Sequence, residues 1–355
     1  MTLLLNTDDT ARLIRTEDAI DTLDAAYRAI ATEDGTHRVR SDLVVATSPT
    51  DVYTLATMEG AIKSLGVAAI RMRSDYARRV DRHGLASSRK WALRPGLYCG
   101  LVVLYSLATA EPLAIINDGH LQVMRVGATS ALAGRYLARA DSKTLGIIGA
   151  SHQARGHARA YVAAFPLEEV KVFSRTPADR DAFAEEMTIE LGIPVRAVGS
   201  AREAVEGCDI VAACTSSRVR LLEDERWIEE GSYTSSIRWF HEFGREGTQL
   251  ADVLVLHNES YGPVLQAGSE EDLESGPAAG RQHKEPLPDD AVLLHDVVAG
   301  LTPGRTNPTQ RTFFNNNMGK GIQFAALGKV AYDRAIAEGI GRELPTEWFL
   351  QDIST

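Results

Sequence analysis

The stretch Lys143-Thr144-Leu145-Gly146-Ile147-Ile148-Gly149-Ala150-Ser151-His152-Gln153-Ala154 decides the fold of this chain. A hydrophobic run of strand length ends at Gly149, and helical spacing begins at about Gln153. A tight turn favours glycine, and the unpaired N–H groups that open a helix suit a pyrophosphate. The stretch therefore predicts the first strand–turn–helix unit of a dinucleotide-binding domain. The residues expected at the cofactor are Gly149, Ala150, Ser151, Gln153 and Ala154.

Ser151 departs from the usual pattern of this turn. The pattern has glycine at this position, because the backbone approaches a phosphate there. Serine is also small, and its hydroxyl is expected to donate a hydrogen bond to a phosphate oxygen.

The end of the next strand predicts which nicotinamide cofactor is bound. Leu167–Phe173 has strand composition and is followed by Ser174, Arg175 and Thr176. An acidic residue here would accept from the ribose 2′-OH and select NAD, whereas these three donors suit a 2′-phosphate. We therefore expect NADP(H) to be favoured over NAD(H). The alternative is that Arg175 is a solvated loop residue.

Strands and helices alternate from Lys143 onward, which is typical of a parallel sheet with helices on both faces. The part before it is predicted to be a helix over Thr16–Asp34 followed mainly by strands. The expected fold class is α/β: a Rossmann-type doubly wound parallel sheet plus a second α+β domain for substrate binding and dimerisation. Expected boundaries are residues 1–124 with 318–355 for that second domain and 125–317 for the Rossmann domain.

The expected strands and helices of both domains follow from hydrophobic periodicity. Strands are predicted over Asp42–Ala46, Tyr53–Met58, Val67–Met72, Gly100–Leu107, Thr144–Ile148, Val170–Phe173, Val195–Val198, Ile210–Cys214, Ser232–Ile237 and Val253–Leu256. Helices are predicted over Met124–Ala138, Pro177–Leu191, Ser200–Glu206 and Asn317–Gly339, and an exposed acidic loop over Ala267–Asp290.

Composition bounds the partners and the compartment. The 355 residues carry a formal net charge of −10, which argues against nucleic acid as a partner. The longest hydrophobic run, near Tyr98–Ala108, is too short for a membrane span, and the N-terminus lacks the basic start of a signal peptide. Cys99, Cys208 and Cys214 have no metal-ligand spacing, so we expect reduced, packed thiols, no metal, and a cytoplasmic protein.

Several motifs in collinear order resemble the ornithine cyclodeaminase/μ-crystallin family. They are Met124–Ala138 (MRVGATSALAGRYLA), Leu145–Gly149 with Gln153-Ala154, Asp209–Thr215 (DIVAACT), Val297–Gly300 with Gly304-Arg305-Thr306, and Phe314–Gly319. The resemblance implies an NAD(P)-dependent enzyme that acts on an amino acid or its imine. It also implies a homodimer formed through the non-Rossmann domain.

The resemblance assigns roles to individual residues. Arg125 matches the arginine that clamps the substrate carboxylate, and its alternative is a helix-start arginine in a surface salt bridge. Arg40 resembles a second substrate-binding arginine, whose alternative is a solvated strand end. Asn317 and the two asparagines before it match a segment that touches the nicotinamide, although asparagine also caps helices. Thr215 follows a Rossmann strand, where hydroxyls commonly meet the nicotinamide ribose, and its alternative is an ordinary turn.

Departures from the family pattern bear on the chemistry. Val126 stands where the family commonly has threonine, and Ala68 or Ala69 stands where it has a lysine. Arg71 is the nearest cation to the missing lysine, but arginine does not release its proton near neutrality. Phe240 falls about where cyclodeaminases carry an aspartate, which argues against cyclodeamination.

Proton transfer is therefore expected from other groups. Glu59 ends a strand that we expect to face the cleft, and His241 follows a Rossmann strand and titrates near neutrality. Asp75 follows Arg71 on the same strand and is placed in the substrate site. The alternative for each of these three residues is an ordinary surface or ion-paired side chain.

Three functions remain open from the sequence. The first is an NAD(P)H-dependent oxidoreductase acting on an α-imino or α-amino acid, of the ketimine reductase or amino-acid dehydrogenase type. The second is an ammonia lyase of the ornithine cyclodeaminase kind with catalytic NAD, and the third is a non-enzymatic cofactor-binding protein.

Overall fold

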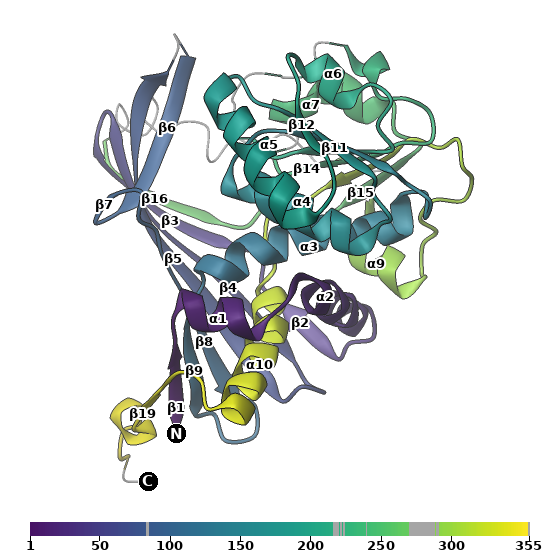
Figure 1. The fold of residues 1–355 in the computed structure, drawn as a ribbon. Coiled ribbons are helices and arrows are strands. Elements are labelled where there is room, and N and C mark those ends of the chain that lie inside the picture. Colours follow the sequence, from purple (N-terminus) through teal and green to yellow (C-terminus); the bar gives the residue numbers. More distant parts are fainter. Residues whose placement is uncertain are drawn as a thin grey trace.

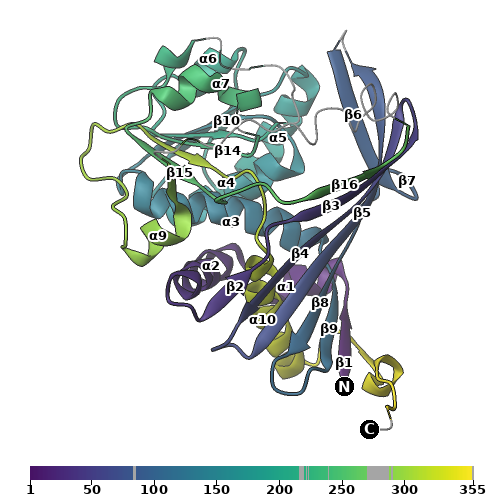
Figure 2. The ribbon, with the colours of Figure 1, turned by 180° about the vertical axis from the view of Figure 1, so that it is seen from behind.

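The computed structural model describes residues 1–82, 85–215, 220, 222, 224–238, 240–269, 288 and 291–353, and within these ranges the chain forms two large sheets. Figure 1 shows them as two bodies with helix α3 (Gly119–Leu137) between them. The two chain ends lie near each other in Figures 1 and 2, at the end of the first body remote from the second.

The first sheet contains eleven of the described strands. In chain order they are β1 (Thr2–Leu5), β2 (Gly35–His37), β3 (Ser41–Ser48), β4 (Asp51–Ile62), β5 (Val67–Arg82), β6 (Leu85–Ala92), β7 (Arg94–Pro95), β8 (Cys99–Ser106), β9 (Pro112–Asn117), β16 (Val264–Ala267) and β19 (Arg342–Leu344). The order in space is β16-β3-β4-β5-β8-β9-β1-β19, with β2 on β4 and the β6–β7 pair on β5.

Described helices cover one face of this sheet. Burial alternates along β4, so that Val52, Ala56 and Met58 point to the inner face. Helix α10 (Gly321–Glu338) packs on that face, with α1 (Thr7–Leu13) and α2 (Thr16–Ala31) next to it.

The second sheet is the predicted Rossmann sheet. Its strands are β10 (Thr144–Ile148), β11 (Glu169–Phe173), β12 (Val195–Ala197), β13 (Ile210–Ala213), β14 (Tyr233–Ser236), β15 (Val253–Leu256), β17 (Val292–Leu293) and β18 (Thr312–Asn315). They lie in the order β12-β11-β10-β13-β14-β18-β15-β17, and every neighbouring pair is parallel. The helices are α4 (His152–Ala164), α5 (Pro177–Leu191), α6 (Ala201–Val205), α7 (Phe240–Gln249) and α9 (Leu294–Ala299); η1 (Glu225–Trp227) and η2 (Thr346–Phe349) are short 3₁₀ turns.

This arrangement confirms the predicted α/β fold class. The chain builds outward from β10 through β11 to β12 and then returns to build β13 and β14 on the other side, which is the doubly wound pattern. Two helix starts were predicted wrongly. Helix α3 begins at Gly119, before Met124, and α10 begins at Gly321, where the extended Lys320 is the N-cap residue in place of the asparagines.

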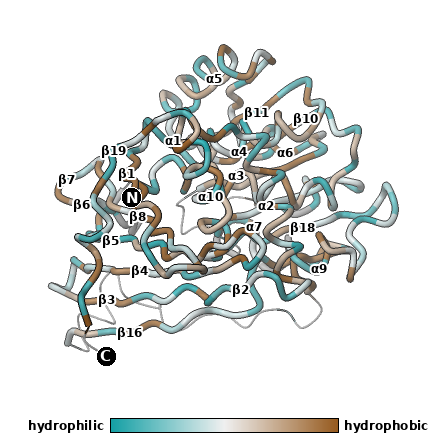
Figure 3. Tube along the Cα trace, turned by 90° about the horizontal axis from the view of Figure 1, so that it is seen from below, coloured by the Kyte–Doolittle hydropathy of each residue, from teal (hydrophilic) through white to brown (hydrophobic). Residues whose placement is uncertain are grey.

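Helix α3 joins the two bodies through unusually close packing. A side chain at Gly127 would overlap the Gly156 carbonyl oxygen, and one at Gly156 would lie 2.7 Å from Val123 Cγ1. These two glycines therefore let α3 and α4 touch backbone to backbone. In Figure 3, α3 and α10 lie toward the middle of the molecule.

The domain boundaries stay a prediction, with one strand that they do not account for. After β15 the chain leaves the second sheet, and β16 pairs with β3 of the first sheet. Most of the predicted loop Ala267–Asp290 lies outside the described residues. Among the cysteines, Cys208 and Cys214 are buried as expected, but Cys99 is exposed at the start of β8, so it is not a packed thiol.

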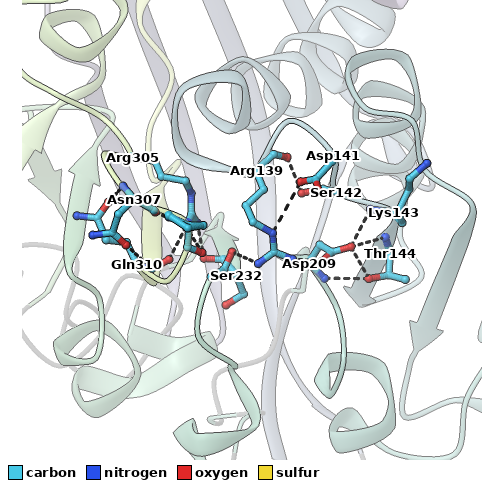
Figure 4. Close-up of polar contacts among 12 residues, drawn as sticks. Arg139, Asp141, Ser142, Lys143, Thr144, Asp209, Ser232, Arg305, Asn307 and Gln310 are labelled. Carbon is cyan, nitrogen blue, oxygen red and sulfur yellow. Dashed lines mark hydrogen bonds and ion pairs between the residues drawn. The ribbon is translucent and has the colours of Figure 1, made fainter.

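Polar contacts hold the amino edge of the second sheet together (Figure 4). The Asp209 carboxylate accepts from the Lys143 and Thr144 amides and pairs with Arg139, which also donates to the Gly231 carbonyl. Arg305 donates to the Leu137, Gln310 and Ser232 carbonyls. The motif residue Arg305 is thus structural, and the opposite, carboxyl edge is left for ligands.

Candidate active site

The turn after β10 has the geometry that a pyrophosphate requires. Gly149 has φ +114°, and a side chain there would lie 2.5 Å from the Cys214 carbonyl oxygen. Helix α4 begins at His152, so its first N–H groups have no partner within the helix. Ala154 is fully buried against the sheet. The turn therefore presents backbone donors and a helix dipole to an anion.

Ser151 differs from its predicted role. Its hydroxyl donates to the Cys214 carbonyl oxygen at 3.2 Å and accepts from the Ala154 amide at 3.4 Å. The single hydroxyl hydrogen is thus used within the protein and is not free for a phosphate oxygen. Ser151 is the N-cap of α4, and only its backbone is left for the cofactor.

The carboxyl end of β11 carries the residues expected at the adenosine ribose. Arg175 and Thr176 are exposed, and Ser174 is half-buried. Arg180, from the first turn of α5, donates to the Ser174 carbonyl at 3.4 Å and lies over the Phe173 ring. Arg175 and Arg180 therefore both lie beside the carboxyl end of β11.

The ends of β13 and β14 are fixed by Glu242. One carboxylate oxygen accepts from the Thr215 amide at 2.8 Å, and the other from the Ser236 hydroxyl at 2.6 Å and the Arg238 amide at 3.0 Å. Burial raises the pKa of Glu242 to about 7. Because these hydrogen bonds join the backbone of both turns and the Ser236 hydroxyl, Glu242 positions Thr215 at the sheet edge.

Unpartnered amides lie at the end of β18. Both amide atoms of Asn315 and of Asn317 are buried without a hydrogen-bond partner among the described residues, as is Gln153 Oε1. Buried polar groups are nearly always paired, so these atoms indicate a polar ligand. A nicotinamide carboxamide and its ribose offer matching donors and acceptors, and the residues therefore fit that cofactor.

A buried hydrogen-bond chain ties this segment to the cofactor turn. Asn316 donates to Ser130 Oγ at 2.9 Å, and Ser130 lies 3.0 Å from His157 Nε2. His157 Nδ1 lies 2.7 Å from the Gln153 carbonyl oxygen. Burial lowers the pKa of His157 to about 4, so the ring is neutral and donates from Nδ1 to that carbonyl. These hydrogen bonds thus fix the end of β18 relative to the turn after β10.

An arginine cluster faces the same edge from the first sheet and α3. Arg71 is buried in β5 and pairs with Asp118 at 2.5 Å. A side chain at Gly100 would overlap that carboxylate, so this glycine gives Asp118 its access to Arg71. Both Arg71 and Arg125 lie over the Phe324 ring, at 5.5 and 5.6 Å from its centre.

Arg125 is the member of the cluster without an acidic partner. It is buried, and its guanidinium donates only to the Gln122 and Gln323 amide oxygens, at 3.0 and 3.4 Å. Within the described ranges no carboxylate forms an ion pair with it. Burial and the charge of Arg71 lower its pKa to about 9. A side chain at Gly319 would lie 2.7 Å from its guanidinium, so the segment that leaves β18 runs directly against it.

The other predicted substrate residues join this cluster but are paired. Arg40 forms a bidentate pair with Asp42, at 2.7 and 3.0 Å. Asp75 is buried and lies 2.7 Å from Arg73, one of its oxygens having no hydrogen-bond partner. The sequence reasoning missed Arg73, although the alternation Arg71-Arg73-Asp75 along one strand places all three on one face.

Glu59 lies on the wrong side of the sheet for its predicted role. Met58 is paired with Arg71, and Glu59 with Ile70. Since neighbouring residues of a strand point to opposite faces, the Glu59 carboxylate is separated from the arginine cluster by the sheet itself. It lies 3.8 Å from Arg38. The side chain of His241 is outside the part of the chain that the structure describes, so its role stays a prediction.

Fold and site together define a protein with a Rossmann-type dinucleotide-binding sheet, whose carboxyl edge faces a buried arginine without an acidic partner among the described residues. A sequence model of the ornithine cyclodeaminase/mu-crystallin family matches residues 92–339, and the chain belongs to this family.

Individual relatives agree with this assignment. A Δ1-pyrroline-2-carboxylate reductase of Bacillus cereus is 27% identical over 248 residues, which are 69% of this chain and 74% of the relative. An alanine dehydrogenase of Archaeoglobus fulgidus is 26% identical over 359 residues, covering 97% and 98%. The structure of Thermococcus litoralis Δ1-pyrroline-2-carboxylate reductase, in complex with NADH and L-proline, has a TM-score of 0.77 and 27% identity and covers 96% of this chain and 100% of its own.

Neither a membrane-spanning helix nor a metal site is present among the described residues. No helix among them has the length and hydrophobicity to cross a membrane. They also contain no group of three or more His, Cys, Asp and Glu side chains placed to hold a metal ion.

Proposed function

We propose that this protein is an NADP(H)-dependent oxidoreductase that reduces an α-imino acid, or oxidises the corresponding α-amino acid. The observation that carries the proposal is Arg125: a buried arginine without an acidic partner, set against the segment that bears the unpartnered asparagine amides. The substrate carboxylate supplies the missing negative charge. The reductase and dehydrogenase activities of the named relatives support the same reaction class.

The residues of this chain bind and orient the substrate. Arg125 holds the carboxylate through charge-assisted hydrogen bonds. The Phe324 ring packs against the guanidinium, and Gln323 accepts a hydrogen bond from it. Arg71, already neutralised by Asp118, packs on the same ring and shapes the site. The bound nicotinamide supplies or accepts the hydride. Placing the carboxylate at Arg125 brings the adjacent α-carbon toward the edge formed by Asn315 and Thr215.

The preference for NADP(H) rests on the end of β11. Ser174, Arg175 and Thr176 include no acid to accept from a ribose 2′-OH, and Arg180 adds a second cation. Arg175→Ala is expected to weaken NADPH binding at least tenfold and leave NADH binding unchanged, in a titration of protein fluorescence. Arg202→Ala, another exposed arginine of this domain, is the matched control. Equal affinities of the unmodified protein for NADH and NADPH would remove the proposed preference.

The proposed assembly is a homodimer in the cytoplasm, joined through the outer face of the first sheet. That face carries exposed or half-buried hydrophobic residues, among them Leu43, Leu55, Ile70 and Met72. Such residues are typical of a surface that is covered by a second copy. Light scattering of Met72→Lys, which should be monomeric, tests this assembly.

The reaction is tested by supplying NADPH with Δ1-pyrroline-2-carboxylate, and separately with 2-oxo acids plus methylamine. Loss of reduced nicotinamide absorbance, abolished in Arg125→Gln and kept in Arg135→Gln on the same helix, supports the oxidoreductase. Consumption of an amino acid without net change in that absorbance would identify a lyase. Cofactor binding without turnover of any of these compounds would identify a binding protein.

A further inference from the structure

A second cluster of ionisable side chains lies next to the site and has no part in the steps above. Lys320 is the N-cap residue of α10, and its side chain is fully buried. Its ammonium lies 2.8 Å from His37 Nε2 and 3.2 Å from a Glu259 carboxylate oxygen. A buried lysine is uncommon and needs an explanation.

The cluster is attached to the nicotinamide edge at several points. Glu259 follows β15, which pairs with β18 up to Asn315. Asn258 donates to the Met318 carbonyl at 2.8 Å. The backbone amide of Lys320 donates to Gln323 Oε1, the same oxygen that accepts from Arg125. The backbone of Lys320 and the Arg125 guanidinium therefore meet at one amide oxygen, and Gly319, the residue before Lys320, lies directly against that guanidinium.

Exposure increases stepwise from the ammonium outward. The side chain of Lys320 is 0% exposed, that of His37 is 7% and that of Glu259 is 44%. Burial lowers the pKa of Lys320, and the Glu259 carboxylate opposes that shift. Burial and the charge of Lys320 lower the pKa of His37 to about 4, so His37 is neutral at pH 7 and accepts from the ammonium. The three groups form a path for a proton between the buried site and water.

On the basis of the proposed function, we propose that Lys320 donates the proton to the substrate nitrogen and that Glu259 and His37 return a proton to it from water. The hydride adds to the imine carbon, and the π electrons of the C=N bond become the electron pair that takes the proton from the Lys320 ammonium. Neutral Lys320 then regains a proton through Glu259. In the oxidative direction the same amine takes the proton from the substrate nitrogen.

Several other ionisable groups face Lys320 and set its titration. His257, after β15, hydrogen-bonds to Tyr27 at 2.5 Å and is kept neutral by burial, which lowers its pKa. His295 and Asp296 approach Lys320 from α9, and His257 lies within reach of the charges of both Lys320 and Arg125. Burial lowers the pKa of His295 as well. Glu259 and Asp296 are the acids that keep Lys320 protonated.

The test compares Lys320→Met and Lys320→Arg in imine reduction, with Lys329→Met on the exposed part of α10 as the control. General acid catalysis is worth about 10²–10⁴-fold, so kcat/KM should fall at least about 100-fold in both Lys320 variants. Arginine keeps the charge but does not release a proton near neutrality, so rescue by arginine would identify a positioning charge and overturn the proposal. NADPH affinity should be unchanged in all three variants.

The pH profile gives a second, independent readout. Because Lys320 must be protonated to donate, kcat/KM of the unmodified enzyme falls as pH rises through its pKa. Glu259→Gln removes a charge that raises this pKa, so the alkaline limb should move to lower pH. An unmoved limb, or less than a threefold loss in Lys320→Met, overturns the assignment of Lys320 alone. Absence of turnover by the unmodified protein overturns the proposed function and this inference with it. If Lys320→Met does not fold, the Glu259→Gln profile decides.

Discussion

Replacing Arg125 by methionine is expected to stabilise the ligand-free protein while it removes carboxylate binding. The guanidinium is buried, carries a positive charge and has amide oxygens rather than a carboxylate beside it. Methionine fills a similar volume against Phe324 without that charge. The prediction therefore separates a binding residue from a structural one.

The magnitude follows from the Arg125 pKa, which burial lowers from its ordinary value to about 9. At about 1.4 kcal/mol per pKa unit, keeping the group charged costs roughly 4–5 kcal/mol in the folded state. Because the folded pKa is below the unfolded one, this cost is present at every pH below about 9. Loss of two amide hydrogen bonds and of the ring contact offsets about 2 kcal/mol. A net gain of roughly 2 kcal/mol in the free energy of unfolding remains.

The assay is urea unfolding at pH 7 for the unmodified protein, Arg125→Met and the control Arg135→Met. The control removes an arginine of the same helix that pairs with Asp21 at the surface, and its stability should change by less than about 0.5 kcal/mol. With NADPH present, pyrrole-2-carboxylate, a planar carboxylate, should stabilise the unmodified protein and the control but not Arg125→Met. A destabilised Arg125→Met, or one that still responds to the carboxylate, would refute the reasoning.

Three further outcomes are expected. Gly149→Ala, which forces a side chain against the Cys214 carbonyl at φ +114°, should weaken NADPH binding at least tenfold in a fluorescence titration. Asp118→Asn leaves Arg71 buried with its charge unpaired, so the free energy of unfolding should fall by about 3–5 kcal/mol in urea; an unchanged midpoint would contradict the ion-pair assignment. His157 is neutral in the folded protein, with a pKa of about 4. Its contribution to the free energy of unfolding, roughly 3 kcal/mol, is present above pH 6.5 and is lost as the pH falls toward 4. In His157→Gln the free energy of unfolding should therefore depend less on pH in this range.

The local sequence was sufficient where one segment decides its own structure. Pro177–Leu191 forms the predicted helix residue for residue, because proline at the first turn and Gly192 after the last both act locally. Gly149 was predictable for the same reason, since the bend and the positive φ belong to one residue. Arg125 could be named only through its resemblance to a family motif. Its lack of an acidic partner among the described residues is seen only in the tertiary structure.

The sequence did not allow prediction of which groups form hydrogen bonds or ion pairs, or of the sheet face on which a side chain lies. The Ser151 hydroxyl does not have its predicted phosphate-binding role, because it donates to the carbonyl of Cys214, which lies 63 positions later in the chain. Glu59 was predicted to face the cleft. The strand register, which places Met58 opposite Arg71 and Glu59 opposite Ile70, puts its side chain on the other face of the sheet. Arg71 was predicted as the cation nearest the missing lysine, and its ion pair with Asp118 depends on a residue 47 positions away in the chain.

The sequence by itself determined the alternation of strands and helices, the phosphate-binding turn and the absence of an acid after β11, since each depends on the order of neighbouring residues. Only the tertiary structure decided which charges are neutralised. Lys320, His37 and Glu259 come from three separate segments and meet at one sheet edge. The energy of a buried charge depends on every group within a few ångströms of it, and such neighbours are set by the packing of the whole chain.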